Sequence, residues 1–388
     1  DILGRVQAEE PLLFLGSEQS PYSLLALSFD EEGRDDFMFD EVGGKISPRI
    51  SSDLPMTLGQ VALLTYDAFN PWCGRASAPC RFFKIRRALV WDKKRQEVFL
   101  CWEDSFQKAA FQVQWPLTSE MSDGALAPRT VDWKSTWTDS QYLEAVAQSL
   151  EDIRDGRFYQ INLLRFWQHQ GSISRAHLLR RLKKFAGPFS AFIDLPDLGL
   201  VSWSPERFVQ IYPEGPKYWI EAAPIKGTRP VSADKAHNLA MIDELQNSAK
   251  DKAELHMIVD LMRNDLQRLS VPRGVTVMDP GTLHSFPNVH HLVARIRGEL
   301  KPRRCLDEIC RAICPGGSIT GAPKREVMDV IHSREERERG YFMGNIWYKD
   351  SYSGHIDSSI LIRTAVRQSA TSWEYAAGSG ITVKSHAY

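Results

Sequence analysis

The chain has 388 residues, and 43% of them are hydrophobic, so it can bury a large core. Its formal net charge is −1 and its acidic and basic residues are interspersed, which argues against a nucleic-acid-binding protein and against binding to an anionic membrane surface. No apolar run approaches the roughly 20 residues of a membrane span, and six cysteines without a CxxC pair favour free thiols in a reducing cytoplasm.

The first third of the chain, residues 1–115, is predicted to be rich in β-strands. Turn-forming Gly, Pro, Ser and Asp separate apolar or alternating runs, at residues 11–15, 23–29, 60–66, 88–91 and 97–102. Residues 116–137 are polar and lack periodicity, so they are predicted to form a surface linker. Helical periodicity appears only in the remaining part, residues 138–388.

Helix signals begin at Thr138, which has the spacing of a capping box with Gln141. Apolar residues follow at helical spacing as far as Gly156, and residues 158–163 then read as a strand. Further helices are predicted at residues 176–185, 250–269, 306–313 and 325–332, and further strands at 189–195, 200–204, 341–348, 356–366 and 373–377. Because helices and strands do not alternate regularly, this pattern favours an α+β fold with large, mainly antiparallel sheets.

Lys226 lies in a segment bounded by Pro and Gly, residues 223–228, directly after a strand-like run. A lysine in such a tight turn can be desolvated, lose its proton and act as a nucleophile. Gly227 would allow the backbone to approach a ligand closely, and Thr228 adds a hydroxyl. Taken alone, the segment is more typical of a solvated turn lysine.

Two carboxylates near the start of the predicted helix 250–269 are candidate metal ligands. Asp251 and Glu254 are one turn apart and therefore share a face. Mg²⁺ commonly binds one or two carboxylates together with water and ligand oxygens. A charged helix surface is the alternative interpretation.

Two further segments could bind an anion. Residues 315–324 form a glycine-rich turn that opens a helix, with hydroxyls at Ser318 and Thr320 beside the free N–H groups of the helix start. Arg363 is predicted to lie in the middle of a strand, where a buried guanidinium needs a planar anion such as a carboxylate. A structural turn and an arginine paired with a neighbouring acid are the alternatives.

Four single positions complete the candidates. Gly378 and Gly380 follow a predicted strand and could offer backbone N–H groups to a ligand. Glu206 lies at a strand end beside a proline, and Gln160 lies inside a strand, where it needs hydrogen-bond partners if it is buried. His291 lies in an apolar stretch, where a hydrogen-bonded core histidine is the default.

The order of these segments resembles the chorismate-utilising enzymes. The resemblance rests on eight segments in sequence, which are residues 159–162, 204–208, 224–228, 254–265, 289–293, 315–324, 362–364 and 377–380. It covers residues 138–385 strongly and the front third more faintly. It implies a single chorismate-binding unit over residues 1–388, in which two large, mainly antiparallel sheets pack as a sandwich with helices outside.

Two positions favour one branch of this family. A lysine at position 226 resembles the branch that makes 4-amino-4-deoxychorismate for p-aminobenzoate and folate, since anthranilate-forming members typically carry alanine there. Gln160 resembles the ammonia-using members, whereas water-using members carry a lysine. An anthranilate-forming activity and a catalytically impaired chorismate-binding subunit are the alternatives.

The resemblance also implies a role for each candidate residue. Lys226 would form a covalent adduct with chorismate, Glu206 would protonate the leaving hydroxyl, and His291 would orient the ring. Mg²⁺ would be bound by Glu254 with support from Asp251, and further metal ligands are expected beyond Tyr388. Substrate contacts are implied for Gln160, Thr228, Ser318, Tyr348, Arg363, Gly378 and Gly380. Ammonia would come from a glutamine amidotransferase on a separate chain, because no Gly-x-Cys-x-Gly motif occurs here.

Overall fold

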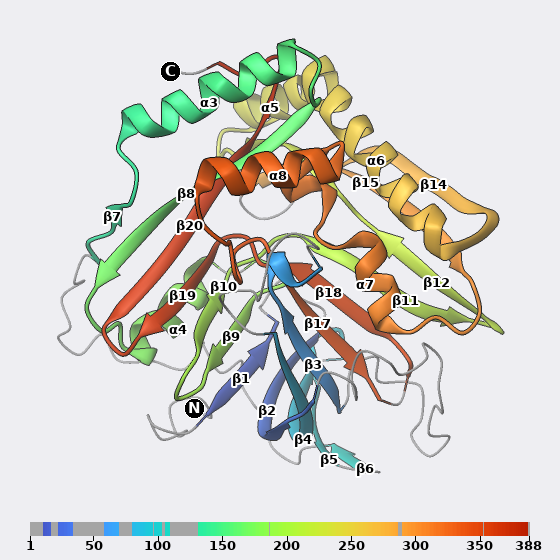
Figure 1. Cartoon of the computed structure of the whole chain (residues 1–388). Coiled ribbons are helices and arrows are strands. Elements are labelled where there is room, and N and C mark those ends of the chain that lie inside the picture. The colour runs from blue at the N-terminus through green and yellow to red at the C-terminus, as the bar shows by residue number, and fades with distance from the viewer. Residues whose placement is uncertain are drawn as a thin grey trace.

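The computed structural model of the chain is an α+β structure in which helices pack on a large antiparallel sheet (Figure 1). The structure describes residues 11–16, 22–33, 58–69, 80–95, 97–102, 105–108, 131–185, 187–285, 289–351 and 353–386. Most of the predicted linker, residues 116–130, lies outside the described residues. None of the described helices is long and apolar enough to cross a membrane.

The elements follow the chain in this order. The strands before residue 131 are β1 (Leu12–Leu15), β2 (Tyr22–Glu31), β3 (Gly59–Leu64), β4 (Arg81–Asp92), β5 (Glu97–Trp102) and β6 (Ser105–Lys108). The later strands are β7 (Lys134–Ser135), β8 (Gln160–Gln170), β9 (Ala191–Asp194), β10 (Gly199–Ser202), β11 (Arg207–Glu214), β12 (Lys217–Ala222), β13 (Ile225–Pro230), β14 (Ser270–Ser285), β15 (Val289–Leu300), β16 (Gly321–Ala322), β17 (Asn345–Asp350), β18 (Ile356–Ile360), β19 (Thr364–Ser369) and β20 (Ser372–Thr382). The helices are α3 (Asp139–Arg154), α4 (Arg175–Phe185), α5 (Lys235–Asn247), α6 (Ala249–Leu269), α7 (Leu306–Ile313), α8 (Lys324–Glu335) and the short 3₁₀ turns η1 (Tyr66–Phe69) and η2 (Gly317–Ile319).

All strand pairings in the described residues are antiparallel, and they link both predicted sheets into one. The strand order is β7, β8, β20, β19, β10, β9, β1, β2, β4, β3, β17, β18, β11, β12, β15 and β14. Figure 1 shows β8, β20 and β19 as one arm and β11, β12, β15 and β14 as the other, with the N-terminal strands between them. The predicted α+β class and antiparallel sheets are therefore confirmed.

The strongest sequence signals gave the right elements. Thr138 caps α3 through a capping box with Gln141, and Gly156 follows the helix with a φ of 77°. The buried face of α6 includes Leu255, Ile258 and Leu266, and this face packs on β14 and β15. Local capping and helical periodicity were sufficient here because both act within a few residues.

Three predicted elements differ from the structure. The strand predicted at residues 356–366 is divided into β18 and β19, and Arg363 lies in the break with a φ of 51°. The strand predicted from residue 341 begins only at Asn345. The helix α5 was not predicted, because Leu245 is its one buried side chain and no apolar stripe marks it.

Candidate active site

Lys226 lies in a strand rather than in the predicted turn. β13 pairs with β15 along the inner side of one arm, and the pairing shifts between Lys226 and Thr228. Gly227 makes this bulge with a φ of 71°, a conformation that favours glycine. A Cβ added at Gly227 would lie 2.7 Å from Leu245 and 3.0 Å from Asp251, so the bulge is packed tightly against α5 and α6.

Glu206 faces the same site from the residue before β11. Its carboxylate accepts a hydrogen bond from the Ser318 hydroxyl at 3.2 Å. Burial raises the pKa of Glu206, while the charge of Lys226 and the hydrogen bond from Ser318 act in the opposite direction. Lys226, which is half-buried, is therefore close enough to Glu206 for the two charges to interact.

His291 lies beside the bulge on β15. Its Nδ1 is 3.0 Å from the Thr228 hydroxyl and 3.2 Å from the Gly227 carbonyl oxygen. Burial lowers the pKa of His291, and the positive charge of Arg363 lowers it further, so the ring favours its neutral form. His291 is thus a hydrogen-bonded histidine, as the default interpretation held, and it lies within the candidate site.

Arg363 reaches this site from the break between two strands. The predicted mid-strand position is wrong, because residue 363 is exposed and has a left-handed backbone. The Arg363 carbonyl accepts a hydrogen bond from the Trp203 N–H at 3.1 Å, which joins this break to the segment that carries Glu206. In the described part of the chain no acid pairs with Arg363, so its guanidinium is available to an anionic ligand.

The glycine-rich segment forms a closed loop. Lys324 donates to the Ile313 carbonyl at 3.0 Å and to the Asp265 carboxylate at 2.7 Å, which ties both ends of the loop to α6. Pro323 is the N-cap of α8, and the loop before it contains η2 and β16. The loop therefore presents Ser318 to Glu206, and it opens a helix as predicted, with Pro323 one position before the first helical residue.

Gln160 lies on the opposite arm, at the start of β8. The Gln160 Nε2 and the Asn162 Oδ1 are buried and have no hydrogen-bond partner in the described residues. Gly378 and Gly380 lie within β20, paired with Leu164 and Asn162, and do not follow the strand as predicted. A Cβ at Gly380 would lie 3.4 Å from Gln160 Nε2, so the absence of a side chain at this glycine leaves space beside the Gln160 amide. Asn162 was missed as a site residue, although its i,i+2 spacing from Gln160 put both on one face.

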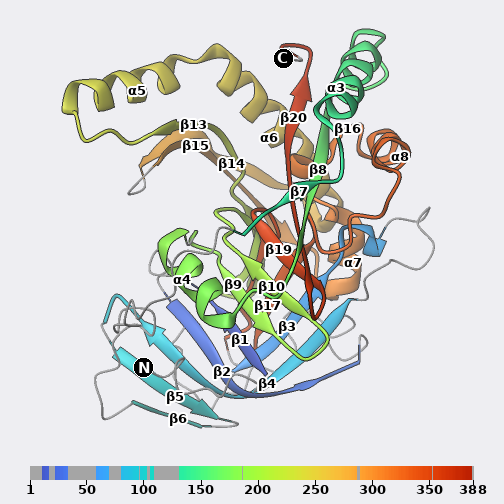
Figure 2. The ribbon, with the colours of Figure 1, turned by 90° about the vertical axis from the view of Figure 1, so that its left-hand side faces the viewer.

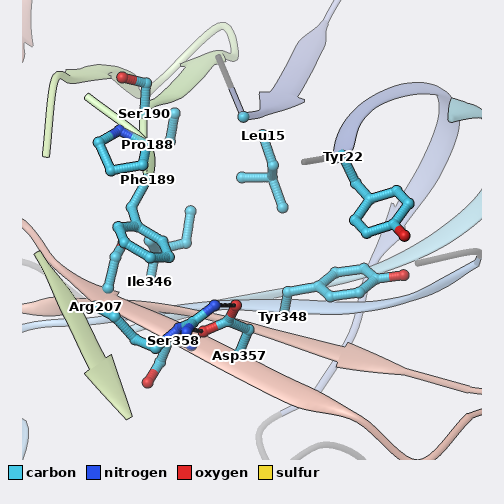
Figure 3. Close-up of a pocket in the computed structure, with 13 residues that line it drawn as sticks. Leu15, Tyr22, Pro188, Phe189, Ser190, Arg207, Ile346, Tyr348, Asp357 and Ser358 are labelled. Carbon is cyan, nitrogen blue, oxygen red and sulfur yellow. Dashed lines mark hydrogen bonds and ion pairs between the residues drawn. The ribbon is translucent and has the colours of Figure 1, made fainter. Parts of the chain in front are cut away.

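Tyr348 lies apart from these residues. Its hydroxyl donates to Asp350 at 3.0 Å, and its ring lines a cavity of about 140 Å³ with Tyr22 and Arg207 (Figure 3). Arg207 is paired with Asp357 through two hydrogen bonds of 2.9 Å on this side of the sheet. Consecutive residues of an extended chain point to opposite faces, which places Arg207 in this cavity and Glu206 towards Ser318.

The predicted metal ligands are only partly suited to Mg²⁺. Asp251 accepts a hydrogen bond from Arg229 at 3.2 Å, so one of its oxygens is already engaged. Glu254 is half-buried and has no hydrogen bond or ion pair within the described ranges, and one such carboxylate is a suitable ligand when substrate oxygens complete the shell. The described residues contain no group of three or more His, Cys, Asp or Glu side chains that could hold a metal ion.

Comparison with known proteins identifies the family. The chorismate binding enzyme family matches residues 45–388. The chain belongs to this family. Aminodeoxychorismate synthase component 1 of Klebsiella aerogenes is 34% identical over 361 residues, covering 88% of this chain and 75% of that protein. The Salmonella typhimurium protein of the same name is 37% identical over 349 residues, covering 87% of this chain and 75% of that protein.

Solved structures of other chorismate-binding enzymes have the same fold. Anthranilate synthase component I from Streptococcus pneumoniae superposes with a TM-score of 0.71 at 24% identity, covering 98% of this chain and 87% of that one. The menaquinone-specific isochorismate synthase of Escherichia coli gives a TM-score of 0.72 at 14% identity, covering 98% and 85%. At these identities the likeness supports the fold alone.

Proposed function

We propose that this chain is the chorismate-using subunit of aminodeoxychorismate synthase, which converts chorismate and ammonia to 4-amino-4-deoxychorismate. The observation that carries this proposal is that Lys226 lies on a packed bulge close enough to Glu206 for their charges to interact. When an amine and a carboxylic acid lie this close together, the amine can attack the substrate as a nucleophile while the acid protonates the leaving group. The Klebsiella and Salmonella relatives carry the corresponding name.

Substrate binding is proposed to use the two arms of the sheet. Chorismate has two carboxylates, and the guanidinium of Arg363 suits one of them. Backbone N–H groups near Gly378 and Gly380 would add contacts from the other arm, and the Thr228 hydroxyl would add one from the bulge. Mg²⁺ held by Glu254 would neutralise the other substrate carboxylate.

The first half of the proposed reaction forms a covalent adduct. The Lys226 amine attacks ring carbon 2, the electrons of the diene shift, and the bond between carbon 4 and its oxygen breaks. Glu206 gives its proton to that oxygen, so water leaves instead of hydroxide. His291, in its neutral form, would orient the ring without adding a positive charge.

The second half releases the lysine. Ammonia attacks carbon 4, the electrons shift back, and the bond between carbon 2 and Lys226 breaks, so the lysine leaves as a neutral amine. The proton that ammonia loses returns to the Glu206 carboxylate. The net change replaces one hydroxyl by one amino group and forms one water. We propose that a separate glutamine amidotransferase supplies the ammonia and that the chain works in the cytoplasm, where the free cysteines at positions 80, 101, 305, 310 and 314 would stay reduced.

Product analysis tests this function. The purified chain is incubated with chorismate, ammonium and Mg²⁺, and the products are separated by chromatography and identified by mass. We expect 4-amino-4-deoxychorismate with the enolpyruvyl group retained. Anthranilate and pyruvate as the main products would overturn the proposal in favour of an anthranilate-forming activity, and chorismate binding without turnover would identify an impaired subunit.

A further inference from the structure

Arg339 is buried next to the candidate site, yet it belongs to none of the predicted site segments. Its side chain is 1% exposed. The guanidinium donates to Glu335 through Nε at 2.9 Å and through Nη2 at 2.6 Å. Burial lowers the pKa of Arg339, but the charge and hydrogen bonds of Glu335, together with Tyr66 and Asp67, raise it overall, so the group remains charged. A buried charge of this kind requires all of its donors to be satisfied.

The other donors of Arg339 reach two segments that carry site residues. Nη1 donates to the Ile319 carbonyl at 3.0 Å, next to Ser318. Nη2 also donates to the Asn162 carbonyl at 2.7 Å, two residues from Gln160. The Arg339 guanidinium therefore joins the loop that carries Ser318 to strand β8, which carries Gln160.

The ion pair of Arg339 with Glu335 also takes the place of a strand on the edge of β8 that does not face β20. β16 pairs with β8 only at residues 160–161, and β7 pairs only at residues 167–168. Between them, the Leu164 N–H donates to Glu335 at 2.8 Å, and the Asn162 N–H donates to the Thr320 carbonyl at 2.7 Å. The Arg339 and Glu335 pair thus holds β8 at two points on the edge opposite β20, between the pairings with β16 and β7.

We propose that Arg339 is a positioning residue that fixes the spacing between Ser318 and β8, and so aligns the Glu206 acid with the substrate. This inference rests on the proposed function. Arg339 has no direct path to the substrate, because its donors are directed at carbonyls and at Glu335, and its guanidinium lies over the ring of Tyr66 at 4.5 Å. It acts through the Ser318 loop, which holds Glu206.

Replacing Arg339 by Lys tests the proposal, because an ammonium keeps the charge but cannot span both carbonyls. The matched control is Arg334→Lys in α8, the helix that carries Glu335, where the guanidinium pairs with Asp152 and donates to Ser149 at 2.7 Å, towards α3 and away from the site. We expect Arg339→Lys to lower kcat by about 10- to 100-fold with a smaller change in KM for chorismate. We also expect it to move the alkaline limb of the pH profile, because Ser318 no longer holds Glu206.

The control outcomes are equally specific. Arg334→Lys should keep kcat within about twofold and leave the pH limb in place. In a Ser318→Ala background the effect of Arg339→Lys should shrink, since both changes disturb one contact. Equal effects of the two arginine variants, or additive effects of Arg339→Lys and Ser318→Ala, would overturn the proposal.

Hydrogen exchange separates this inference from the proposed function, because it needs no turnover. Peptides covering residues 160–166 and 316–320 should exchange faster in Arg339→Lys and unchanged in Arg334→Lys. If Arg339→Lys does not fold, Glu335→Gln provides the same comparison with the arginine in place. Unchanged exchange in these peptides would overturn the positioning role even in an active enzyme. A wild-type chain that forms no product would refute the proposed function and leave the result of the exchange experiment standing.

Discussion

In the proposed mechanism, Lys226 and Glu206 become reactive through their surroundings. Neither type is unusual in a sequence, and a lysine between Pro and Gly is most often solvated. Here Gly227 packs on Asp251 and Leu245, and burial raises the pKa of Glu206 against the charge of the lysine. Substitutions at Lys226 and Glu206 should therefore affect, respectively, the formation of the covalent bond and the transfer of the proton.

Lys226→Ala should abolish the covalent adduct with chorismate, because no other amine occupies the bulge. The measurement is intact mass spectrometry of the protein after incubation with chorismate and Mg²⁺ without ammonia. Lys217→Ala is the control, since Lys217 is half exposed and pairs with Glu299 at 2.8 Å on the neighbouring strand. An adduct of unchanged yield in Lys226→Ala would contradict the assigned nucleophile.

If Glu206 is the proposed acid, its raised pKa should set the alkaline limit of turnover. A carboxyl group with a raised pKa keeps its proton to a higher pH, so the acid form is present below that pKa and is lost as the pH rises through it. Turnover should therefore fall on the alkaline side. Glu206→Gln should lower kcat by about 10²- to 10⁴-fold and remove this limb from the pH-rate profile. A limb that persists in Glu206→Gln would assign it to another group.

At the scale of elements, the site depends on irregularities in otherwise regular strands. The bulge in β13 turns Lys226 and Thr228 towards Glu206 and His291, and the break between β18 and β19 delivers Arg363. Bulges beside active sites re-aim side chains in this way. Helix α6 packs against this bulge, with Asp251 next to Gly227.

Gly227→Ala should lower both stability and activity. The positive φ alone costs about 1–2 kcal/mol for a residue with a Cβ, and the contact with Leu245 adds a further cost because that side chain must move. Gly215→Ala is the matched control, since Gly215 has a φ of 62° and open space around its Cβ position. Thermal unfolding and kcat measure the two effects. Equal losses of stability in both variants, with unchanged turnover, would show that the packing of the bulge is unimportant.

Glu254→Gln should raise the Mg²⁺ concentration needed for half-maximal turnover by about 10- to 100-fold. The physical reason is the loss of the one α6 carboxylate that has no partner in the described residues. Asp260→Asn is the control on the same helix, because Asp260 is exposed and pairs with Arg263. An unchanged Mg²⁺ requirement in titrations after treatment with EDTA would remove Glu254 from the metal site.

At the scale of the whole molecule, the sheet brings distant segments together. Gln160 on β8 and Lys226 on β13 belong to different arms, which the N-terminal strands connect through β1, β4 and β3. Figure 2 shows the arm with β13, β15 and α5 extending away from β8 and β20. The candidate site residues are thus placed by the entire strand order and not by any one part of it.

The chain alone should use ammonium but not glutamine as its nitrogen source. Its sequence has no Gly-x-Cys-x-Gly nucleophile segment for glutamine hydrolysis. Adding a glutamine amidotransferase subunit should restore turnover with glutamine, measured as glutamate release coupled to product formation. Turnover with glutamine by the purified chain alone would refute the separate-partner proposal.

Much of the fold and of the site was predictable from local pattern. The capping box at Thr138 and the periodicity of α6 and α7 were read correctly, because caps and helical faces depend on residues three or four positions apart. The Pro- and Gly-bounded segment marked Lys226 and the strand end marked Glu206 as candidates, and the family resemblance implied a role for each. The residue types in the site were therefore present in the sequence before any geometry was known.

The sequence by itself determined the α+β class, the family and the chemical inventory of the site, because these depend on local spacing and on the order of segments along the chain. Only the tertiary structure decided that Lys226 lies on a bulge, that Arg363 breaks a strand, that Tyr348 lies in a separate cavity and that Arg339 joins the Ser318 loop to β8. The reason is that bulges, breaks and buried ion pairs are fixed by partners far away in the chain. Ile319 and Asn162 are separated by more than 150 residues, and no local pattern records that one guanidinium binds both.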